Sequence, residues 1–534
     1  MCGILAIIGN GDSTKIKELK KRGPDEYGFY KDKHIYLGHQ RLSIVHPEAG
    51  PQPIFYNDWV VTMNGEIYNY RASVDETDCY IVPQLLEKCG TDGISQLDGI
   101  FSFVAYNKKT KEIVVARDAI GVTPLYYSKK PIAFSSIMYG LDEDSHVEVV
   151  PPGTYAHFKV GENDFTFQKW TTPYSNWDTE GSSTEGSRKV DEEIVPKMEH
   201  AVRKRLMGNV PWGVLLSGGL DSTIVATIAT HVAATVRPDY PTVHSFCIGL
   251  QDSPDIRVAE QVAKEIGTCH VSCTYTVEEG IKALPDVIKA IETYDLTTVR
   301  ASTPMWILGK ILKTRGIKMV LSGEGSDELF AGYLYNLYCP SEREMVEECK
   351  RKLDQLYAYD CLRANKTLGD WGVESRVPFL DQDIVDLAMN QLPPIHKLSG
   401  THPDGPKAEK WWLRESFRDI IPDCVVDRTK AQFSDAVGNK WILALQKYAE
   451  SQITDVAFAK ASETYPYNTP TTKEAYLYRE MFHSVFKHDN AEKTVLYTGD
   501  SIACSTSTAS QWHQEFKNHL DPSGESIHLI KQSR

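Results

Sequence analysis

The stretch that most constrains the fold is Ser217–Ser222, which reads SGGLDS. An apolar run over residues 212–216 precedes it and predicts a buried strand, while residues 223–229 predict a helix packed on that strand. Adjacent glycines reach backbone conformations closed to other residues, so successive N–H groups of such a turn can converge on an anion. The N-terminus of the following helix adds partial positive charge. The segment therefore predicts a phosphate-binding turn between a strand and a helix.

Two well-known phosphate-binding patterns do not fit this turn. The Gly-Lys-Ser/Thr ending of a Walker loop is missing, and so is the three-glycine spacing of a dinucleotide fingerprint. Ser217 and Ser222 can donate hydroxyls, and Asp221 can hold a magnesium ion. The SGGxDS pattern resembles the PP-loop of the ATP pyrophosphatases, which cleave ATP between the α- and β-phosphates to make acyl-adenylates. The alternative is an ordinary Gly-Ser turn.

The composition excludes several classes of function. The 534 residues carry a formal net charge of −14 and no Lys/Arg-rich block, which argues against a nucleic-acid surface. No run approaches the ~18–20 apolar residues of a membrane span, and we expect no signal peptide. Eleven cysteines without a CxxC pair indicate a reduced, cytoplasmic compartment, with Cys269 and Cys273 as buried thiols.

The second residue is a cysteine. If Met1 is removed, Cys2 carries a thiol and a free α-amine on one residue. Because an α-amine has an ordinary pKa of ~7.7–8.0, it can take the thiol proton directly or through a water and create a thiolate nucleophile. The alternative is a frayed terminal residue. The apolar run Ile4–Ile8 argues against fraying, because it predicts a buried strand that would hold the terminus inside.

Six further segments follow MCGI in the first 130 residues: RGPD (22–25), GHQRLSIV (38–45), NGEIYN (64–69), TDC (77–79), LDGIFSF (97–103) and ARDAIGVTPLYY (116–127). This ordered set resembles the class II glutamine amidotransferase domain of the N-terminal-nucleophile fold, over about residues 2–160. The resemblance implies an αββα sandwich. The segment between Asn69 and Asp78 is shorter than in many bacterial members of that family, which could change how the glutamine pocket closes.

The chemistry of these segments suits glutamine. The guanidinium fork of Arg41 matches its α-carboxylate, and Glu66 and Asp78 match its α-ammonium. The Asn64 side chain and the Gly65 N–H can stabilise the oxyanion formed on amide attack. The resemblance makes Cys2 the nucleophile, Asn64 and Gly65 the oxyanion hole, and the following residues the glutamine-binding set: Arg41, Leu42, Ser43, Ile44, Val45, Asn64, Gly65, Glu66 and Asp78.

Each of these residues also has an ordinary structural interpretation. Arg41 could form a surface salt bridge, Asn64-Gly65 is a common hairpin turn, and Asp78 could cap the helix that follows it. Together these interpretations are improbable, because they would have to coincide in one ordered set.

The second half of the chain predicts a parallel sheet. Residues 175–188 are rich in Ser, Gly, Thr and Glu and predict a linker, and residues 191–207 predict an amphipathic helix. Residues 243–249 predict a second strand after the phosphate-binding turn, which completes a βαβ unit. Further strands are predicted over residues 268–276 and 317–321.

The last of these strands ends in SGEGSDELFAGY (322–333), which places glycines, hydroxyls and carboxylates where open α/β sheets bind ligands. Three more clusters follow: VESRVPFLD (373–381), Pro406-Lys407 and RTKAQFSD (428–435). With the PP-loop, these segments resemble the synthetase domain of the glutamine-hydrolysing asparagine synthetases, over about residues 195–450. The two halves in this order match the architecture of that family.

The resemblance carries roles onto matching residues. Glu324 would take part in the adenylate step as a base when ammonia attacks, and Lys430 would neutralise charge on the departing pyrophosphate. Asp221 and Asp327 are the candidate ligands of Mg²⁺. Lys430 and Arg376 could instead be solvated surface charges. The residues expected to bind ATP are Leu216, Ser217, Gly218, Gly219, Asp221, Ser222, Ile248, Ser322 and Gly323.

These inferences predict a chain of mixed α/β and α+β class. The αββα sandwich over residues 2–172 would be followed by a linker over 173–190. A doubly wound parallel-sheet ATP pyrophosphatase domain with a helical C-terminal part would occupy residues 191–485, and a polar extension residues 486–534.

The predicted function is that of a two-site ligase with glutamine, aspartate and ATP as substrates. Cys2 would release ammonia from glutamine, and the ammonia would displace AMP from a β-aspartyl adenylate. Because ammonia protonates in water, we expect a dry passage between the sites. The resemblance implies a homodimer, and neither nucleic acid nor a membrane is an expected partner.

Four alternatives remain open. A sugar-phosphate or phosphoribosyl amidotransferase should lack the PP-loop. A β-lactam synthetase would not need Cys2 and the glutamine-binding residues. A regulatory paralogue should have lost key residues, and none of those matched is lost. An amidotransferase of the same architecture could act on a different carboxylate.

Overall fold

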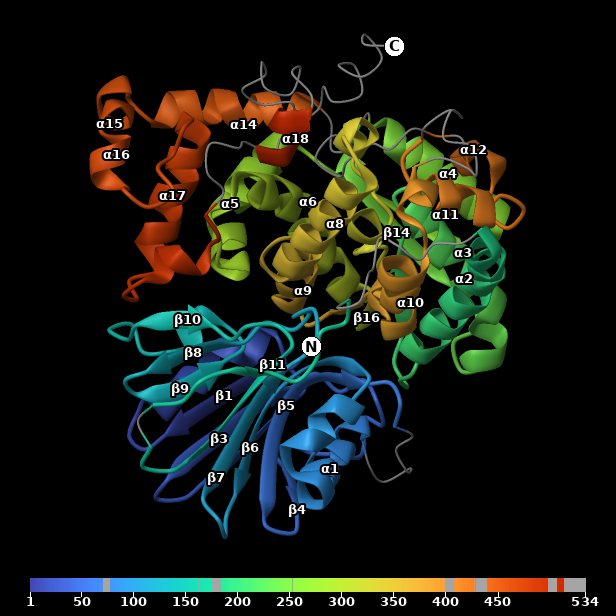
Figure 1. The fold of residues 1–534 in the computed structure, drawn as a ribbon. Helices are drawn as coiled ribbons and strands as arrows, with labels where there is room; N and C mark the ends of the chain where they lie inside the picture. Colours follow the sequence, from blue (N-terminus) through green and yellow to red (C-terminus); the bar gives the residue numbers. More distant parts are fainter. Residues whose placement is uncertain are drawn as a thin grey trace.

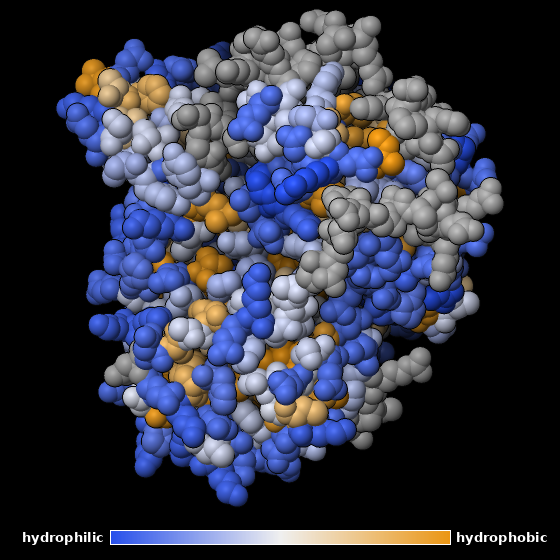
Figure 2. All heavy atoms as spheres, in the orientation of Figure 1, coloured by the Kyte–Doolittle hydropathy of each residue, from blue (hydrophilic) through white to orange (hydrophobic). Residues whose placement is uncertain are grey.

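The computed structural model of the chain describes residues 1–70, 77–162, 164–174, 184–251, 253–398, 408–426, 428, 439–497 and 507–512. It has a β-sandwich domain and an α/β domain stacked on it, and the N-terminus lies where the two meet (Figure 1). The face in Figure 2 is mostly hydrophilic, with small separate hydrophobic patches. No helix among the described residues has the length and apolar character needed to cross a membrane.

The first domain packs two antiparallel sheets face to face. Alternating apolar residues of both sheets, such as Ile4, Leu37, Val60 and Val104, fill the space between them. Each sheet has six strands within the described residues. In spatial order the first contains β10 (Val147–Val149), β8 (Tyr126–Lys129), β9 (Ile132–Ser135), β1 (Gly3–Ile8), β3 (Ile35–Arg41) and β2 (Glu26–Lys31). The second contains β12 (Gln168–Lys169), β11 (Thr154–Lys159), β7 (Glu112–Arg117), β6 (Gly99–Asn107), β5 (Trp59–Ile67) and β4 (Ile54–Tyr56).

Helical layers cover both outer faces of this sandwich. Helix α1 (Ile81–Cys89) packs on β5 of the second sheet. The 3-10 helix η1 (Ser13–Lys21) packs on the first sheet. The rest of that face packs against α5 (Val277–Ile291) and α17 (Lys473–Val485) of the second domain. The second domain therefore supplies part of an outer layer of the first.

The second domain is built on a parallel sheet, as predicted from its βαβ pattern. Its strand order is β15 (Cys269–Tyr275), β14 (His244–Leu250), β13 (Trp212–Leu215), β16 (Met319–Leu321) and β17 (Glu374–Arg376). The chain runs outward from β13 to β15 and then returns to β16 on the other side of β13. Because ligands bind where the strand order reverses, this topology places a crevice at the carboxyl ends of β13 and β16.

Helices flank the sheet and fill the rest of the domain. Helix α3 is buried along much of its length because most of its residues are apolar and the small side chains of Thr223 and Thr227 are buried with them. The helices before β16 are α2 (Thr184–Arg205), α3 (Leu220–Val236), α4 (Pro254–Ile266), α5 and α6 (Leu296–Thr314). Those after it include α7 (Ser326–Leu329), α8 (Glu342–Gln355), α9 (Asp360–Gly369), α10 (Gln382–Asp386), α11 (Trp411–Ser416), α12 (Asp423–Val426), α14 (Asn439–Gln452), α15 (Asp455–Ala459), α16 (Ala461–Thr464), α17 and α18 (Ser507–Trp512).

Two sequence predictions need correction. Cys269 is exposed rather than buried, because it opens the edge strand β15, whereas Cys273 is buried as expected. The helix predicted over residues 191–207 begins at Thr184 and ends at Arg205, because it extends into the segment predicted as a linker.

The two domains meet across a mixed interface. An apolar cluster joins residues of the first domain, such as Ile44 and Val45, to residues of the second, such as Val202 and Leu206. Beside the apolar contacts lies a fully buried ion pair between Lys366 of α9 and Glu292. The Lys366 ammonium also lies 2.5 Å from the hydroxyl of Tyr126 on β8.

The Lys366 ion pair predicts a large effect on stability. Lys366→Met would leave Glu292 buried without its cation, which typically costs about 3–5 kcal/mol. We expect the variant to unfold at a clearly lower urea concentration than the wild type, with unfolding monitored by circular dichroism. Arg343→Met is the control, since it breaks an exposed pair with Glu347 and should cost no more than about 0.5 kcal/mol.

Equal midpoints for the two variants would contradict this role of the Lys366 pair. Lys366→Met combined with Glu292→Gln should recover most of the loss, because no unpaired charge is then buried.

Candidate active sites

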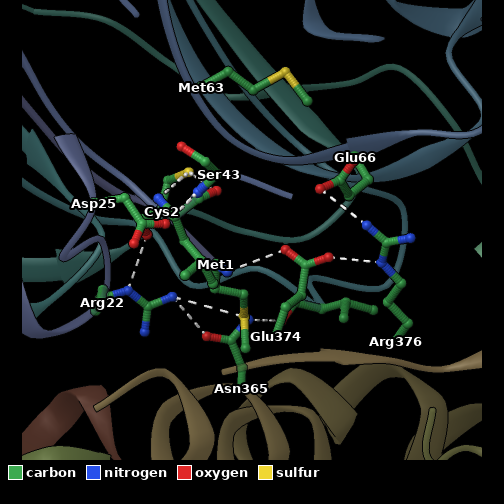
Figure 3. A network of polar contacts seen from close by, with 12 residues as sticks. Met1, Cys2, Arg22, Asp25, Ser43, Met63, Glu66, Asn365, Glu374 and Arg376 are labelled. Carbon is green, nitrogen blue, oxygen red and sulfur yellow. Dashed lines mark hydrogen bonds and ion pairs between the residues drawn. The ribbon is translucent and has the colours of Figure 1, made fainter. Parts of the chain in front are cut away.

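The first site surrounds Cys2. Since β1 pairs with β3, the chain just before β1 lies beside the chain just after β3. The Leu42 N–H accordingly donates to Cys2 Sγ at 3.4 Å, and Arg22 Nε donates to the Cys2 carbonyl at 3.1 Å. Met1 is 1% exposed, and its ammonium lies 3.1 Å from Glu374 Oε2 of the second domain (Figure 3). The terminus is therefore pinned inside the protein and is not frayed.

Burial dominates the acidity of this thiol. It raises the pKa of Cys2 to about 11, and the nearby terminal ammonium offsets only part of the effect. At neutral pH the group is therefore a thiol, and it needs a neighbouring base before it can act as a nucleophile.

Asn64 and Gly65 lie inside β5, so they do not form a hairpin turn. Asn64 is fully buried, and neither polar atom of its amide has a partner within the described residues. A buried amide without partners is rare, and its donor suits an oxyanion that arrives with the substrate. Gly65 has φ +132°, and a Cβ there would lie 1.9 Å from the Ile100 carbonyl oxygen of β6. Position 65 therefore requires glycine because the backbone of the neighbouring strand β6 lies too close for a side chain.

Arg41 is buried and forms the expected salt bridge, with the exposed Glu26, but most of its acceptors are backbone carbonyls. Its guanidinium donates to Glu26 Oε2 at 2.9 Å and to the carbonyls of His46, Pro47 and Ala49. The structure thus fixes Arg41 against the loop that follows β3. An incoming carboxylate would have to share or replace some of these acceptors.

Glu66 and Asp78 form a buried acidic pair. The Ile67 N–H donates to Asp78 Oδ2 at 2.7 Å, so Asp78 is held by β5 and makes no side-chain cap bond to its own helix. Burial raises the pKa of Glu66 well above its ordinary value, the charge of Asp78 raises it further, and Arg376 lowers it. Burial also raises the pKa of Asp78, to about 6. Glu66 Oε2 has no hydrogen-bond partner within the described residues. The pair is therefore ready to accept a cation.

The remaining predicted glutamine-binding residues follow Arg41. Leu42 contacts the Cys2 thiol, and the Ser43 N–H donates to Asp25 Oδ2 at 2.8 Å. Ile44 and Val45 lie in the apolar cluster between the domains. The structure brings Leu42 to Cys2 and places Ile44 and Val45 in the interface between the domains.

The second site lies at the carboxyl end of β13. Gly218 adopts φ +74°, and Gly219 caps the N-terminus of α3. The hydroxyls of Ser217 and Ser222 lie 3.1 Å apart across the turn, and Ser222 Oγ also accepts from the Ser217 N–H. The left-handed glycine and the cross-turn serine contacts form the predicted cradle.

Asp221 and Asp327 share one buried lysine. Lys410 Nζ lies 2.6 Å from Oδ1 of each carboxylate, and its residue is 1% exposed. Sequence reasoning missed Lys410. The available signal was a charged residue placed directly before the apolar run Trp411–Leu413. Its ammonium marks the position between the two carboxylates as one that attracts cations.

Glu324 contacts Arg363 of α9, whose Nη2 donates to both carboxylate oxygens at 2.9 and 2.8 Å. Burial raises the pKa of Glu324, and Arg363 lowers it. Arg363 also pairs with Asp360, one turn away on the same helix. Sequence reasoning missed Arg363 because its partner is 39 residues away.

The predicted nucleotide-binding residues lie around the same crevice. Leu216 follows β13, Ile248 lies in β14, and Ser322 follows β16. A Cβ on Gly323 would come within 2.9 Å of Asp221 Cβ, which shows how closely the two glycine-rich loops approach. Lys430 and Pro406-Lys407 lie outside the described residues.

Arg428 is a further residue that was not assigned a role from sequence. Its Nη1 donates to the Gly218 carbonyl at 2.8 Å, and its Nη2 pairs with Asp255 of α4. It therefore brings positive charge to the PP-loop, in a chain whose net charge is −14.

The PP-loop geometry predicts a local effect of Gly218→Ala. A Cβ there would lie 2.9 Å from the Ala259 N of α4 at a backbone angle that only glycine adopts readily. We expect this variant to lose about tenfold or more of its affinity for Mg-ATP by isothermal titration calorimetry.

Gly316→Ala is the matched control for that experiment. Gly316 has the same φ of +74°, but its Cβ would meet nothing within 4 Å. This variant should keep its ATP affinity. Equal losses in both variants would show that strain alone, and not the shape of the PP-loop, explains the result.

Comparisons with known proteins match both halves of the chain. The family description "Glutamine amidotransferase domain" matches residues 1–158, and "Asparagine synthase" matches residues 193–348 and 338–514. The asparagine synthetase (glutamine-hydrolyzing) of Asparagus officinalis is 44% identical, covering 98% of this chain and 92% of that protein. A protein of the same name, numbered 1, from Arabidopsis thaliana is 43% identical over 99% of this chain and 94% of its own length.

Solved structures give weaker likenesses. The glutamine phosphoribosylpyrophosphate amidotransferase of B. subtilis covers 51% of this chain and 81% of its own at 11% identity, with a TM-score of 0.27. The match to the NMN synthetase of Francisella tularensis covers 59% of this chain and 98% of that one at 11% identity, with a TM-score of 0.26. Scores this low carry no argument. On the matches of both halves and the full-length relatives, the chain belongs to the glutamine-hydrolysing asparagine synthetase family.

Proposed function

We propose that this chain makes asparagine from aspartate and ATP, with nitrogen taken from glutamine. One observation carries the proposal. A half-buried Cys2 and a buried, unpartnered Asn64 amide lie on one side of a shared apolar interface, and a glycine-rich PP-loop with two carboxylates lies on the other. The family matches cover both halves, which favours asparagine synthesis over an amidotransferase with a different acceptor.

In the first half-reaction, the Cys2 sulfur attacks the side-chain amide of glutamine. Removal of Met1 would give Cys2 an α-amine, which can take the proton that the buried thiol holds tightly. The Asn64 amide and the Gly65 N–H would stabilise the oxyanion. The tetrahedral intermediate then expels ammonia and leaves a γ-glutamyl thioester. Water hydrolyses the thioester to glutamate and restores the thiol.

The buried charges of this site suit the rest of glutamine. Glu66 and Asp78 would bind the α-ammonium, since a cation between them relieves the cost of burying two carboxylates. Arg41 would bind the α-carboxylate by exchanging some of its present acceptors. Leu42 and Ser43 would border the side chain through their closeness to Cys2 and Asp25.

In the second half-reaction, the β-carboxylate of aspartate attacks the α-phosphorus of ATP, and pyrophosphate departs. Ser217, Gly218, Gly219 and Ser222 would donate to the phosphates from the PP-loop. Lys410, which already bridges Asp221 and Asp327, would supply positive charge as pyrophosphate forms. We propose the same role for Lys430. Leu216, Ile248, Ser322 and Gly323 would surround the nucleoside.

Magnesium fits the carboxylates of this site. Mg²⁺ is usually bound by one or two carboxylates together with substrate phosphates, and Asp221 and Asp327 provide the two carboxylates. The Lys410 ammonium shows that the space between them favours a cation. When bound, Mg²⁺ would neutralise charge on the phosphates. Asp221 and Asp327 would hold it, and Lys410 would turn toward the phosphates.

In the last step, ammonia attacks the β-carbonyl of the adenylate and AMP leaves with the bonding electrons. Glu324 would take a proton from the attacking nitrogen, and Arg363 would keep it ionised and oriented. The apolar cluster that packs against Cys2 also contains Val377 and Phe379 of the second domain. Such surroundings would keep ammonia away from water, where it would be protonated.

We also propose that the chain works as a homodimer in the cytoplasm. The edge strand β2 supports self-association, because it exposes 48% of Tyr27 and 55% of Phe29 on one sheet face. Sedimentation velocity tests this assembly.

The separation of the two sites predicts a selective effect of Cys2→Ala. Loss of the nucleophile should reduce glutamine-dependent asparagine synthesis by about a thousandfold or more. Synthesis from ammonium chloride should stay comparable to the wild type, because Glu324 and the PP-loop are untouched. Both rates can be measured by chromatographic assay of asparagine. Loss of both activities in a folded variant would contradict separable sites.

The acidic pair predicts how the glutaminase depends on pH. Its pKa values are raised, so the ionised forms are lost as the pH falls through about 6, where Asp78 protonates. We expect kcat/KM for glutamine, measured by glutamate release, to decrease by about tenfold per pH unit below that point.

Asp12→Asn should leave this acid limb in place, because Asp12 lies on the exposed surface and its carboxylate accepts hydrogen bonds from Thr14, two residues along the chain. A flat profile between pH 7 and 5 would count against a glutamine-binding role for Asp78.

A further inference from the structure

The strand β17 of the second domain reaches into the glutamine site of the first. Its residue Arg376 is fully buried, so the alternative of a solvated surface charge is wrong. Nε of Arg376 donates to Glu374 Oε1 at 2.7 Å, and Nη1 donates to the carbonyls of Arg205 and Met207. Its Nη2 lies 3.1 Å from Glu66 Oε1 (Figure 3). The guanidinium is therefore fixed by the second domain and directed at a carboxylate of the first.

The Arg376 contact uses only one oxygen of Glu66. The other, Oε2, is buried and has no hydrogen-bond partner in the part of the chain that the structure describes. A buried carboxylate oxygen without a partner is costly, so this atom is suited to a donor that arrives with a ligand. Asp78 is the second carboxylate nearby, and one of its oxygens is held by the Ile67 N–H.

The main chain of Arg376 belongs to the other site. Its carbonyl accepts from the Ser322 N–H at 2.9 Å, because β16 and β17 pair in parallel with Leu321 opposite Arg376. One residue thus contacts the proposed glutamine pocket through its side chain and the proposed ATP loop through its backbone. Among the described residues, the cation that pairs with Glu66 comes from the second domain.

We propose that Arg376 is a positioning residue for glutamine, supplied by the synthetase domain, which holds Glu66 so that its free oxygen binds the α-ammonium of the substrate. This inference rests on the proposed function of Glu66. It means that the recognition part of the glutaminase site is completed only when the two domains are docked. Arg376 itself acts through Glu66 and does not touch the reacting amide.

The experiment compares full-length wild type, Arg376→Met, Arg376→Lys, Glu66→Gln and the double variant Arg376→Met/Glu66→Gln in glutamate release. The single variants Arg376→Met and Glu66→Gln should each raise KM for glutamine by about tenfold or more with kcat little changed. Arg376→Lys should restore part of the affinity, because it keeps the charge without the planar fork. In the Glu66→Gln background, Arg376→Met should have almost no further effect.

A substrate analogue provides a second test of the same contact. Glutaramic acid is glutamine without its α-amino group, so it lacks the ammonium that Glu66 would bind. With this analogue, wild type and Arg376→Met should show nearly equal kcat/KM. A general structural defect would instead lower kcat/KM for glutamine and for glutaramic acid alike. It would also lower ammonia-dependent asparagine synthesis.

Several outcomes would overturn the proposal. One is an unchanged KM for glutamine in an Arg376→Met variant that retains ammonia-dependent synthesis. Another is additive losses in the double variant. If Arg376→Met fails to fold, an unchanged KM in Glu66→Gln is equally decisive. Failure of the proposed function is distinct, because then the wild type itself would release no glutamate from glutamine.

Discussion

The two halves of this chain depend on an interface in which buried charges are paired across the domain boundary. Arg376 of the second domain contacts Glu66 of the first, and Glu374 of the second domain pairs with the Met1 ammonium. Lys366, whose ion-pair partner Glu292 lies in its own domain, reaches across to the hydroxyl of Tyr126. Burying an ion costs several kcal/mol unless a well-placed partner compensates for it. Separating the domains would leave the charges that pair across the boundary without their partners. The pairs therefore stabilise one docking geometry more than they add to overall stability, and that geometry sets where the two sites lie relative to each other.

This fixed docking matters for the chemistry because the intermediate shared by the sites is ammonia. The apolar cluster between the domains contains residues that pack against Cys2 and residues that follow β17. Helix α9 links the same regions by polar contacts, since Arg363 bonds Glu324 while Asn365 bonds Arg22 beside the N-terminus. An apolar interface of this kind would let ammonia released at one site reach the other before water protonates it.

Local patterns were enough to predict the strand, turn and helix at Ser217–Ser222, the parallel sheet around it and the buried strand β1 that follows Cys2. Such features depend on neighbours within a few residues. Lys410, Arg363 and Arg376 were missed or left open because each takes its role from partners far along the chain. Lys410 meets Asp221 across 189 residues, for example. The sequence around a charged residue does not indicate which distant carboxylate the fold will place beside it.

The most direct test of this account follows the nitrogen atom. Purified protein would receive aspartate, Mg-ATP and glutamine labelled with ¹⁵N in its side-chain amide, with excess unlabelled ammonium in the solution. Mass spectrometry would then measure the label in asparagine. The account predicts mostly labelled asparagine, because ammonia passes between docked sites without mixing with the solvent. Label diluted to the level of the ammonium pool would contradict a protected transfer, and glutamate without any asparagine would contradict the coupled reaction itself.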